Sequence, residues 1–148
     1  MNVSWNPQTD WVLWALLSAS FAALTAIFAK LGLEGIDSDY ATLIRTVVIF
    51  VVLALFVFAT GKWTAPARIP GRSWLFLVLS GLATGASWVC YFRALKVGDA
   101  SRVAPVDKAS VVLVAIFAFI FLGERPGVRE WIGIGLVTAG VVVLALKR

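Results

Sequence analysis

Residues 101–126 read SRVAPVDKASVVLVAIFAFIFLGERP. From Val103 to Gly123 the stretch is almost wholly apolar, and it is long enough to cross the hydrocarbon core of a bilayer, which takes about 20 apolar residues. It nevertheless carries two opposite charges, Asp107 and Lys108, near its beginning. Length and hydropathy predict a transmembrane helix. The two charges predict that this helix faces a bundle interior or a wet cavity, because a charge at the bilayer centre costs roughly 2.5–3.5 kcal/mol.

Four further blocks of the chain have the same apolar character. Of the 148 residues, 61% are hydrophobic and 14% are charged, whereas a soluble domain has about 45–50% and about 25%. The five predicted spans cover residues 11–31, 40–60, 74–95, 102–123 and 128–146. The connections are short, so consecutive helices should be antiparallel neighbours. The sequence therefore predicts an all-α membrane bundle of five transmembrane helices that forms one domain over residues 1–148.

The composition argues against several classes of function. The chain has no histidine and one cysteine, which removes the commonest general base and any thiolate metal site. We therefore expect no enzyme activity, no catalytic residue, no metal and no cofactor. The net charge of +5 comes from basic residues that flank the spans, so no nucleic-acid partner is expected. The first basic residue is Lys30, so no secretory signal peptide is expected either.

Five spans place the two ends of the chain on opposite sides of the membrane. We call the side of the N-terminus side A and the side of the C-terminus side B. Five basic residues flank the spans on side A and six on side B. An excess of Lys and Arg on one face sets the orientation of a membrane protein. The near balance predicts dual topology, with copies inserted both ways; a single orientation set by another signal is the alternative.

The charges near or inside the spans all lie toward side B. They are Lys30, Arg45, Arg93, Asp107 and Lys108. Asp107 and Lys108 are adjacent and should point about 100° apart on a helix, so each is expected to find its partner on another helix. Arg45 or Arg93 is the expected partner of Asp107. We interpret the set as a polar vestibule open toward side B that suits a carboxylate or phosphate-bearing solute; snorkelling of the long side chains to the headgroups is the alternative.

A polar stripe runs along the third predicted span. Ser80, Thr84, Ser87 and Tyr91 recur at the spacing of one helical face. Such a stripe is either the wall of a pathway or a set of hydrogen bonds between helices. Trp88 lies beside it and could stack on a substrate or a cation, or pack against lipid.

Two glycine pairs indicate close helix packing. Gly81 and Gly85 form a G-x-x-x-G pair in the third span, and Gly133 and Gly140 share a face of the last span. The last span is a natural seam for a second copy of the chain.

The segments YFRALKVGDASRVAPVDKASVVLVAIFAFIFLGERP and WIGIGLVTAGVVVLAL resemble the EamA-type domain of the drug/metabolite transporter superfamily. The resemblance covers essentially the whole chain as one five-span unit. It implies a transporter of small metabolites, amino acids or drugs, in which two such units lie in inverted orientation. This chain has one unit, so it looks like a half-length member, comparable to the small multidrug resistance proteins that work as antiparallel dimers. Glu124 matches the family's glutamate after the fourth span and is expected to cap the start of the fifth.

Together these observations predict a secondary transporter, acting as an exporter of a small polar or amphipathic metabolite and working as a homodimer, with an antiparallel arrangement if topology is dual. The expected location is the cytoplasmic membrane of a prokaryote, and the expected partners are lipid, a second copy and the solute. The alternatives are a half-transporter or flippase subunit that needs a different partner, and a non-transporting scaffold subunit. The expected substrate contacts are Arg45, Thr84, Ser87, Trp88, Tyr91, Asp107 and Lys108. The residues expected to serve structure are Lys30, Arg93, Gly81, Gly85, Glu124, Gly133 and Gly140.

Overall fold

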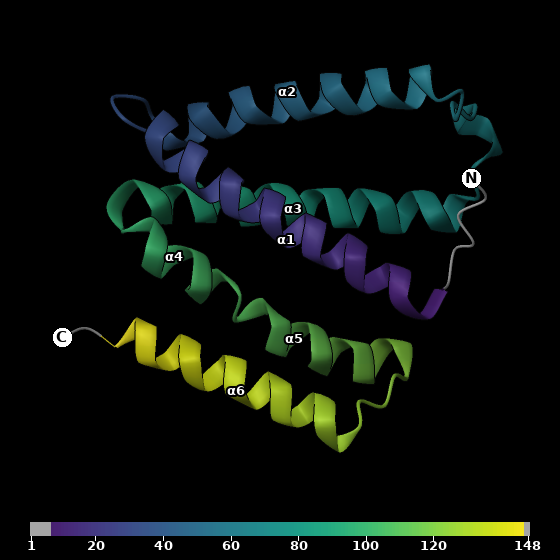
Figure 1. The fold of residues 1–148 in the computed structure, drawn as a ribbon. Helices are drawn as coiled ribbons and strands as arrows, with labels where there is room; N and C mark the ends of the chain where they lie inside the picture. The colour runs from purple at the N-terminus through teal and green to yellow at the C-terminus, as the bar shows by residue number, and fades with distance from the viewer. Residues whose placement is uncertain (1–6, 147–148) are drawn as a thin grey trace, which may run out of the picture.

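The computed structural model describes residues 7–146, and the side chains of residues 11–146. The described part of the chain is helical and contains no strand, which confirms the all-α prediction. Its elements are α1 (Pro7–Gly32), α2 (Ser38–Ala59), the 3-10 turn η1 (Pro66–Arg68), α3 (Gly71–Val97), α4 (Ala100–Asp107), α5 (Ser110–Phe117), the π-helical turn η2 (Ala118–Leu122) and α6 (Val128–Ala145) (Figure 1). Within the described residues, five helical segments are long and apolar enough to cross a membrane, as predicted.

The fourth membrane segment is not one continuous helix. Residues 100–122 cover the length of a span, but α4 ends at Asp107 and α5 begins at Ser110. Pro105 lies inside α4 and has no N–H to donate. At the break, the N–H groups of Lys108 and Ala109 donate to the carbonyls of Pro105 and Val106, three residues back, at 3.0 and 2.9 Å. The tighter turn satisfies the backbone and changes the direction of the chain between two half-helices.

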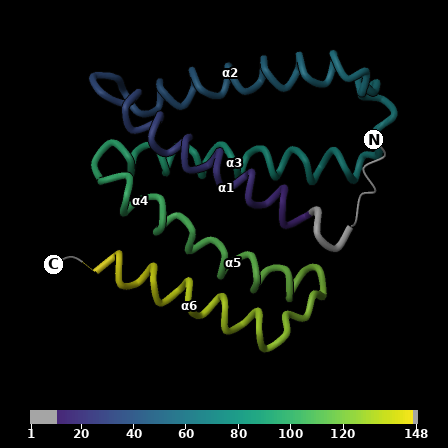
Figure 2. Tube along the Cα trace, in the orientation of Figure 1, coloured from purple at the N-terminus to yellow at the C-terminus, as the bar shows by residue number. Residues whose placement is uncertain are grey.

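The helices are joined most closely at side B. In Figures 1 and 2 the α1–α2 loop, the α3–α4 loop and the end of α6 lie at one end of the bundle, and the α2–α3 and α5–α6 connections lie at the other. α2 runs along α3, and α4 packs on α6, as expected of antiparallel neighbours. α1 diverges from α2 and packs across α3 and α4 instead.

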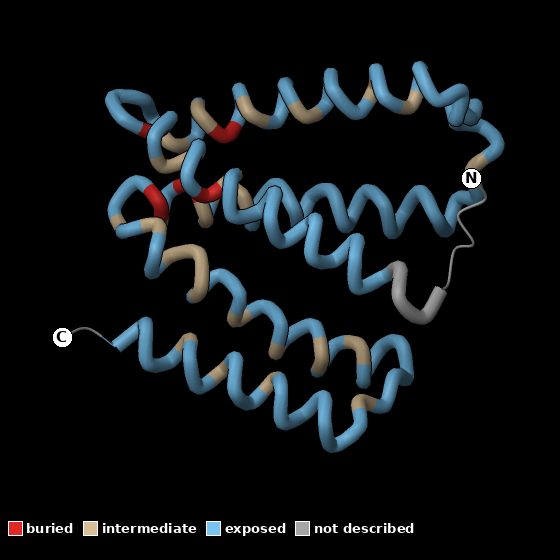
Figure 3. Tube along the Cα trace, in the orientation of Figure 1, coloured by how far each residue is buried: buried red, intermediate tan, exposed pale blue. Residues whose placement is uncertain are grey.

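The buried core lies at this same end (Figure 3). Leu33, Phe92 and Leu95 form its centre, and Ala26 and Thr42 are the other buried residues of the described chain. Most remaining large apolar side chains are exposed, such as Phe58 at 74% and Phe121 at 77%. In a membrane these side chains are covered by lipid or by another chain, so their exposure is compatible with stability.

Two lysines hold the core together by capping each other's helices. Lys30 Nζ, on α1, donates to the carbonyls of Leu95 and Gly98 at 2.7 and 2.9 Å. Lys96 Nζ, on α3, donates to the carbonyls of Leu33 and Ile36 at 2.8 and 2.6 Å. The last carbonyls of a helix have no partner within it and carry the negative end of its dipole, so Lys30 supplies both donors and charge to the end of α3. Lys96 does the same for the turn that follows α1, which ends at Gly32. We call these two lysines and their four carbonyls the lysine clamp.

The α3–α4 turn is fitted closely to the clamp. A Cβ on Gly98 would lie 2.9 Å from Val103 Cγ2 and 3.1 Å from the Ala94 carbonyl, closer than side chains normally approach. Glycine at this position therefore lets α4 fold back against α3 directly beside the carbonyl that Lys30 uses.

α2 is tied to α3 by an ion pair. Arg93 donates to both carboxylate oxygens of Asp39, with Nε–Oδ1 at 2.9 Å and Nη2–Oδ2 at 2.6 Å. Asp37 caps α2 next to this pair, accepting from the N–H groups of Asp39 and Tyr40. The prediction that Asp107 pairs with Arg93 is wrong, because Asp39 occupies the guanidinium in a bidentate geometry.

Replacing Lys30 with methionine should lower stability by about 1–3 kcal/mol, because two carbonyls at the α3 end lose their donor while the chain keeps its volume. Thermal unfolding of the purified chain in a neutral detergent measures the effect. Lys62→Met, in an exposed loop, is the matched control and should unfold like the unchanged protein. Equal unfolding temperatures for the two variants would contradict a stabilising role for the clamp.

Candidate functional site

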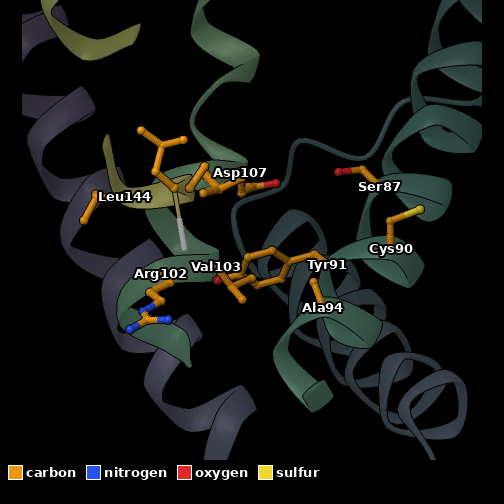
Figure 4. Close-up of a pocket in the computed structure, with 11 residues that line it drawn as sticks. Ser87, Cys90, Tyr91, Ala94, Arg102, Val103, Asp107 and Leu144 are labelled. Atoms are coloured by element: carbon orange, nitrogen blue, oxygen red, sulfur yellow. The ribbon is translucent and has the colours of Figure 1, made fainter. Parts of the chain in front are cut away.

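A cavity of about 490 Å³ opens between α3, α4 and the end of α6, on the side-B half of the chain (Figure 4). The residues that line it are Ser87, Cys90, Tyr91, Ala94, Arg102, Val103, Val106, Asp107, Leu144, Ala145 and Leu146. Its volume is in the range of sites for small ligands, and its walls are mainly apolar with a few polar groups, which is typical of such sites.

The polar groups of the cavity come from two helices. α3 contributes the Ser87 and Tyr91 hydroxyls, and α4 contributes the Asp107 carboxylate and the Arg102 guanidinium. Figure 4 shows the Asp107 carboxylate and the Ser87 hydroxyl facing each other from opposite walls. Arg102 precedes Asp107 by five residues, about 7–8 Å of helical rise, so it lies closer to the side-B opening. A solute could thus meet a cation first and an anion with hydroxyls farther in.

Asp107 is paired with its own neighbour. Lys108 Nζ lies 3.7 Å from Asp107 Oδ2, and the two side chains are 59% and 38% exposed. The prediction that these residues could not pair is wrong. The two side chains do leave the backbone in different directions, because Lys108 keeps helical dihedral angles at the C-cap of α4. The flexible lysine side chain can nevertheless reach back to the carboxylate while the rest of Asp107 stays in the cavity.

Arg45 lies on the other side of α3, against two aromatic rings. Its guanidinium carbon is 4.3 Å from the centre of the Trp88 ring and 5.3 Å from that of Phe92. The interpretation that Trp88 stacks on a cation therefore has a structural counterpart, and the cation is Arg45 of the same chain. The predicted pairing of Arg45 with Asp107 does not form; Lys108 is the ion-pair partner of Asp107.

The polar stripe of α3 is divided by the fold. Ser87 and Tyr91 line the cavity. Thr84 instead donates to the Ser80 carbonyl of its own helix at 2.9 Å and is exposed. Sequence reasoning missed Cys90 and Arg102 as cavity residues. Cys90 lies three residues after Ser87, so helical periodicity could have placed it on the same wall.

The glycine pairs lie against no other helix in the described part of the chain. A Cβ on Gly81, Gly85, Gly133 or Gly140 would meet nothing within 4 Å in the described structure. Close packing at these positions stays a prediction, and it would have to involve a second chain or lipid.

Glu124 does not cap α6. The N-cap of α6 is Gly127, and it makes no side-chain capping hydrogen bond. Glu124 lies three residues earlier in the extended GERPG connection, where its N–H donates to the Ala118 carbonyl at 3.2 Å and closes the π-helical turn.

As for metals, the described residues contain no group of three or more His, Cys, Asp or Glu side chains that could hold an ion.

Residues 9–146 match the model of the EamA-like transporter family. The chain belongs to the EamA-like transporter family. A Sinorhizobium sp protein named "Uncharacterized transporter in cobO 3'region" is 63% identical over 137 residues, which cover 93% of this chain and 97% of that protein. The family membership and the five apolar helices establish an integral membrane protein of a transporter family.

More distant relatives differ in length. The chain is 27% identical to the probable 4-amino-4-deoxy-L-arabinose-phosphoundecaprenol flippase subunit ArnE of Hamiltonella defensa. The 86 aligned residues cover 58% of this chain and 76% of ArnE. The chain is 28% identical over 104 residues to a riboflavin transporter of Vibrio cholerae and spans 34% of that protein. No solved structure matched the chain significantly.

Cys90, the one cysteine of the sequence, reports on the cavity without any engineering. Small water-soluble methanethiosulfonate reagents should label it faster than a cysteine that faces lipid, because the reaction needs a hydrated thiolate. The measurement is the labelling rate, read by mass spectrometry on the reconstituted chain. The control carries Cys90→Ala together with Leu53→Cys, at an exposed apolar position of α2. A similar rate for both cysteines would contradict a water-filled cavity.

Proposed function

We propose that this chain is a secondary transporter that exports a small polar or amphipathic metabolite and works as a homodimer in the cytoplasmic membrane of a prokaryote. The observation that carries the proposal is the cavity between α3, α4 and α6, which joins three polar side chains and an arginine to mainly apolar walls. Membership in a transporter family supports the same conclusion. We assign no enzyme activity to it, in keeping with the absence of histidine from the sequence.

The broken fourth span lets the walls of the cavity move relative to each other. Discontinuous helices in transporters expose backbone groups to substrates at membrane depth, and irregular backbone is tolerated there only where protein or water satisfies it. Here the break at Lys108 directly follows Asp107, which lines the cavity. A change of angle between α4 and α5 would move Asp107 relative to Ser87 and Tyr91 on α3. In the proposed cycle this change alternates the side from which the solute can enter.

The solute contacts in the cavity are Ser87, Tyr91 and Asp107. Asp107 accepts hydrogen bonds from the solute or carries a proton. Lys108 neutralises its charge when the site is empty. Arg45 and Trp88 contact the solute on the opposite face of α3. Thr84 contacts it closer to side A, after the cavity has opened toward that side.

A second copy would complete the transporter. Alternating access in many transporters relies on two similar units in inverted orientation, and this chain has one unit. The exposed glycines of α3 and α6 allow a second chain to approach closely. The nearly balanced basic residues at the two sides would allow copies of both orientations, giving an antiparallel homodimer.

A second candidate function is a flippase subunit that needs a different partner. The similarity to ArnE, which is named as a subunit, favours it. In that case the opposite orientation comes from another protein rather than from a second copy, and the cavity described above lies at the junction of the two proteins. A non-transporting scaffold would need neither the cavity nor its charges.

Cells that express the chain should release a set of metabolites that cells carrying Arg45→Gln, Asp107→Asn and Lys108→Gln together do not release. The triple variant removes the three charges that the sequence predicts to contact the solute, so export should fall by about tenfold or more. Mass spectrometry of the spent medium measures it, with Arg102 left unchanged and expression levels matched. Arg72→Gln, at the start of α3, is the control that loses a charge elsewhere. Export that survives the triple substitution removes the basis of the proposal.

Reporters fused to the C-terminus, one active in the cytoplasm and one outside it, should both give signal. Dual insertion predicts comparable fractions of the two orientations, because the flanking charges barely differ. Signal from one reporter alone would exclude an antiparallel homodimer and favour the partner-dependent subunit.

A further inference from the structure

Arg45 is a membrane-embedded cation that the fold leaves without an anion. It lies on α2, half-buried, with its guanidinium against the faces of Trp88 and Phe92 of α3. The described residues supply it with neither a salt bridge nor a hydrogen bond. The two carboxylates that could have served lie elsewhere, since Asp39 is held by Arg93 and Asp107 by Lys108.

The depth of Arg45 argues against snorkelling. Arg45 lies seven residues after the start of α2, about 10 Å from its side-B end. Trp88 lies nine residues before the end of α3, about 13 Å from side B, and Phe92 lies closer to that end. The guanidinium is nearer to Trp88, the deeper ring, than to Phe92. The side chain therefore does not extend toward the side-B headgroups but stays within the hydrocarbon region.

Aromatic contact alone does not offset the cost of this position. A cation–π contact contributes about 0.5–2 kcal/mol, whereas an arginine in the bilayer core costs roughly 2.5–3.5 kcal/mol on the most lenient scale. Arginine characteristically stacks its planar guanidinium on aromatic faces, and the guanidinium carbon of Arg45 lies over both rings. Its five N–H donors lie in the plane, at the edge, and form a fork that matches a carboxylate or phosphate. An arginine stacked in this way has its edge pre-oriented for a planar pair of oxygen acceptors.

We propose that Arg45, Trp88 and Phe92 form an oxyanion-binding site inside the membrane, which takes a carboxylate or phosphate group on the edge of the Arg45 guanidinium. Trp88 and Phe92 fix the plane of the guanidinium, and the low dielectric strengthens the charge-assisted hydrogen bonds to the oxyanion. The oxyanion comes either from a solute or from a lipid headgroup. The inference depends on the proposed function only for the further step that the oxyanion belongs to the transported solute.

The test measures binding without transport. The full chain is purified in an uncharged maltoside detergent, and thermal unfolding is followed as inorganic phosphate is added, with chloride at the same ionic strength as the reference. A second arm adds dioleoylphosphatidylglycerol to the micelles, with dioleoylglycerol, which lacks the phosphate, as its reference. Each arm is run on the unchanged chain, on Arg45→Gln and on Arg45→Lys. Arg72→Gln is the matched control, because Arg72 also lies over an aromatic ring, Phe76, at 5.9 Å, but at the start of α3.

The unchanged chain and Arg72→Gln should be stabilised by the same concentrations of at least one probe, and Arg45→Gln should need about tenfold more of it or more. Arg45→Lys should also weaken binding, because lysine keeps the charge but loses the planar fork. If Arg45→Gln does not fold, the response of Arg45→Lys decides whether probe binding depends on Arg45. Stabilisation by phosphate assigns a solute site, and stabilisation by phosphatidylglycerol alone assigns a lipid site.

The proposal is overturned if neither probe stabilises the chain, or if both Arg45 variants respond like the unchanged chain. Failure of the transport hypothesis looks different. If binding depends on Arg45 but cells expressing the chain export nothing, the oxyanion site stands and the proposed export function fails. If export is observed while neither probe depends on Arg45, export stands and this site fails.

Discussion

The reciprocal capping of α1 and α3 by two lysines is the interaction on which the rest of the chain depends. Lys30 binds carbonyls at the end of α3, and Lys96 binds carbonyls just after the end of α1, at distances of 2.6–2.9 Å. This brings the ends of α1 and α3 together around Leu33, Phe92 and Leu95, which are the centre of the buried core. Because Gly98 is one of the capped positions, the clamp also fixes where α4 starts. The cavity wall made by α4 and the aromatic face of α3 that meets Arg45 both follow from this placement.

The bilayer explains why a few charged side chains determine how the helices are held together. Water cannot satisfy a polar atom in the hydrocarbon region, so each charged side chain there needs a partner in the protein, the lipid headgroups or a ligand. The lysines of the clamp use backbone carbonyls, and Arg93 uses Asp39. Lys108 uses Asp107 at a distance of 3.7 Å, which leaves the carboxylate accessible from the cavity. Among the described residues, the partners of Arg45 are two aromatic rings and not an oxygen acceptor, unlike those of the other charges named here.

The sequence predicts the number and limits of the spans well, because hydropathy and helix length are local properties. It also places the charges correctly in the side-B half of the bundle. The predicted ion-pair partner was wrong where it depended on tertiary contacts, because Arg93 binds Asp39 rather than Asp107. The sequence offered no signal for the bonds of Lys96 to the turn after α1. The helix break at Lys108 could not be predicted from Pro105 alone, because a proline within a helix often produces only a kink. The 100° separation of Asp107 and Lys108 did not prevent their pairing, because the lysine side chain is long enough to reach the carboxylate.

The two candidate sites share one helix, and this gives α3 a specific role under the proposed function. Ser87 and Tyr91 face the cavity, while Trp88 and Phe92 face Arg45. The cavity residues and the aromatic residues alternate along α3. A small rotation or tilt of this helix therefore changes the cavity and the surroundings of Arg45 at the same time. At side B this helix is held by the clamp and by Asp39, whereas toward side A its residues are exposed and a Cβ on Gly81 or Gly85 would meet nothing within 4 Å among the described residues. In the proposed cycle α3 pivots about this fixed end. Occupation of one site would then alter the geometry of the other through α3 itself, without any contact between the two ligands.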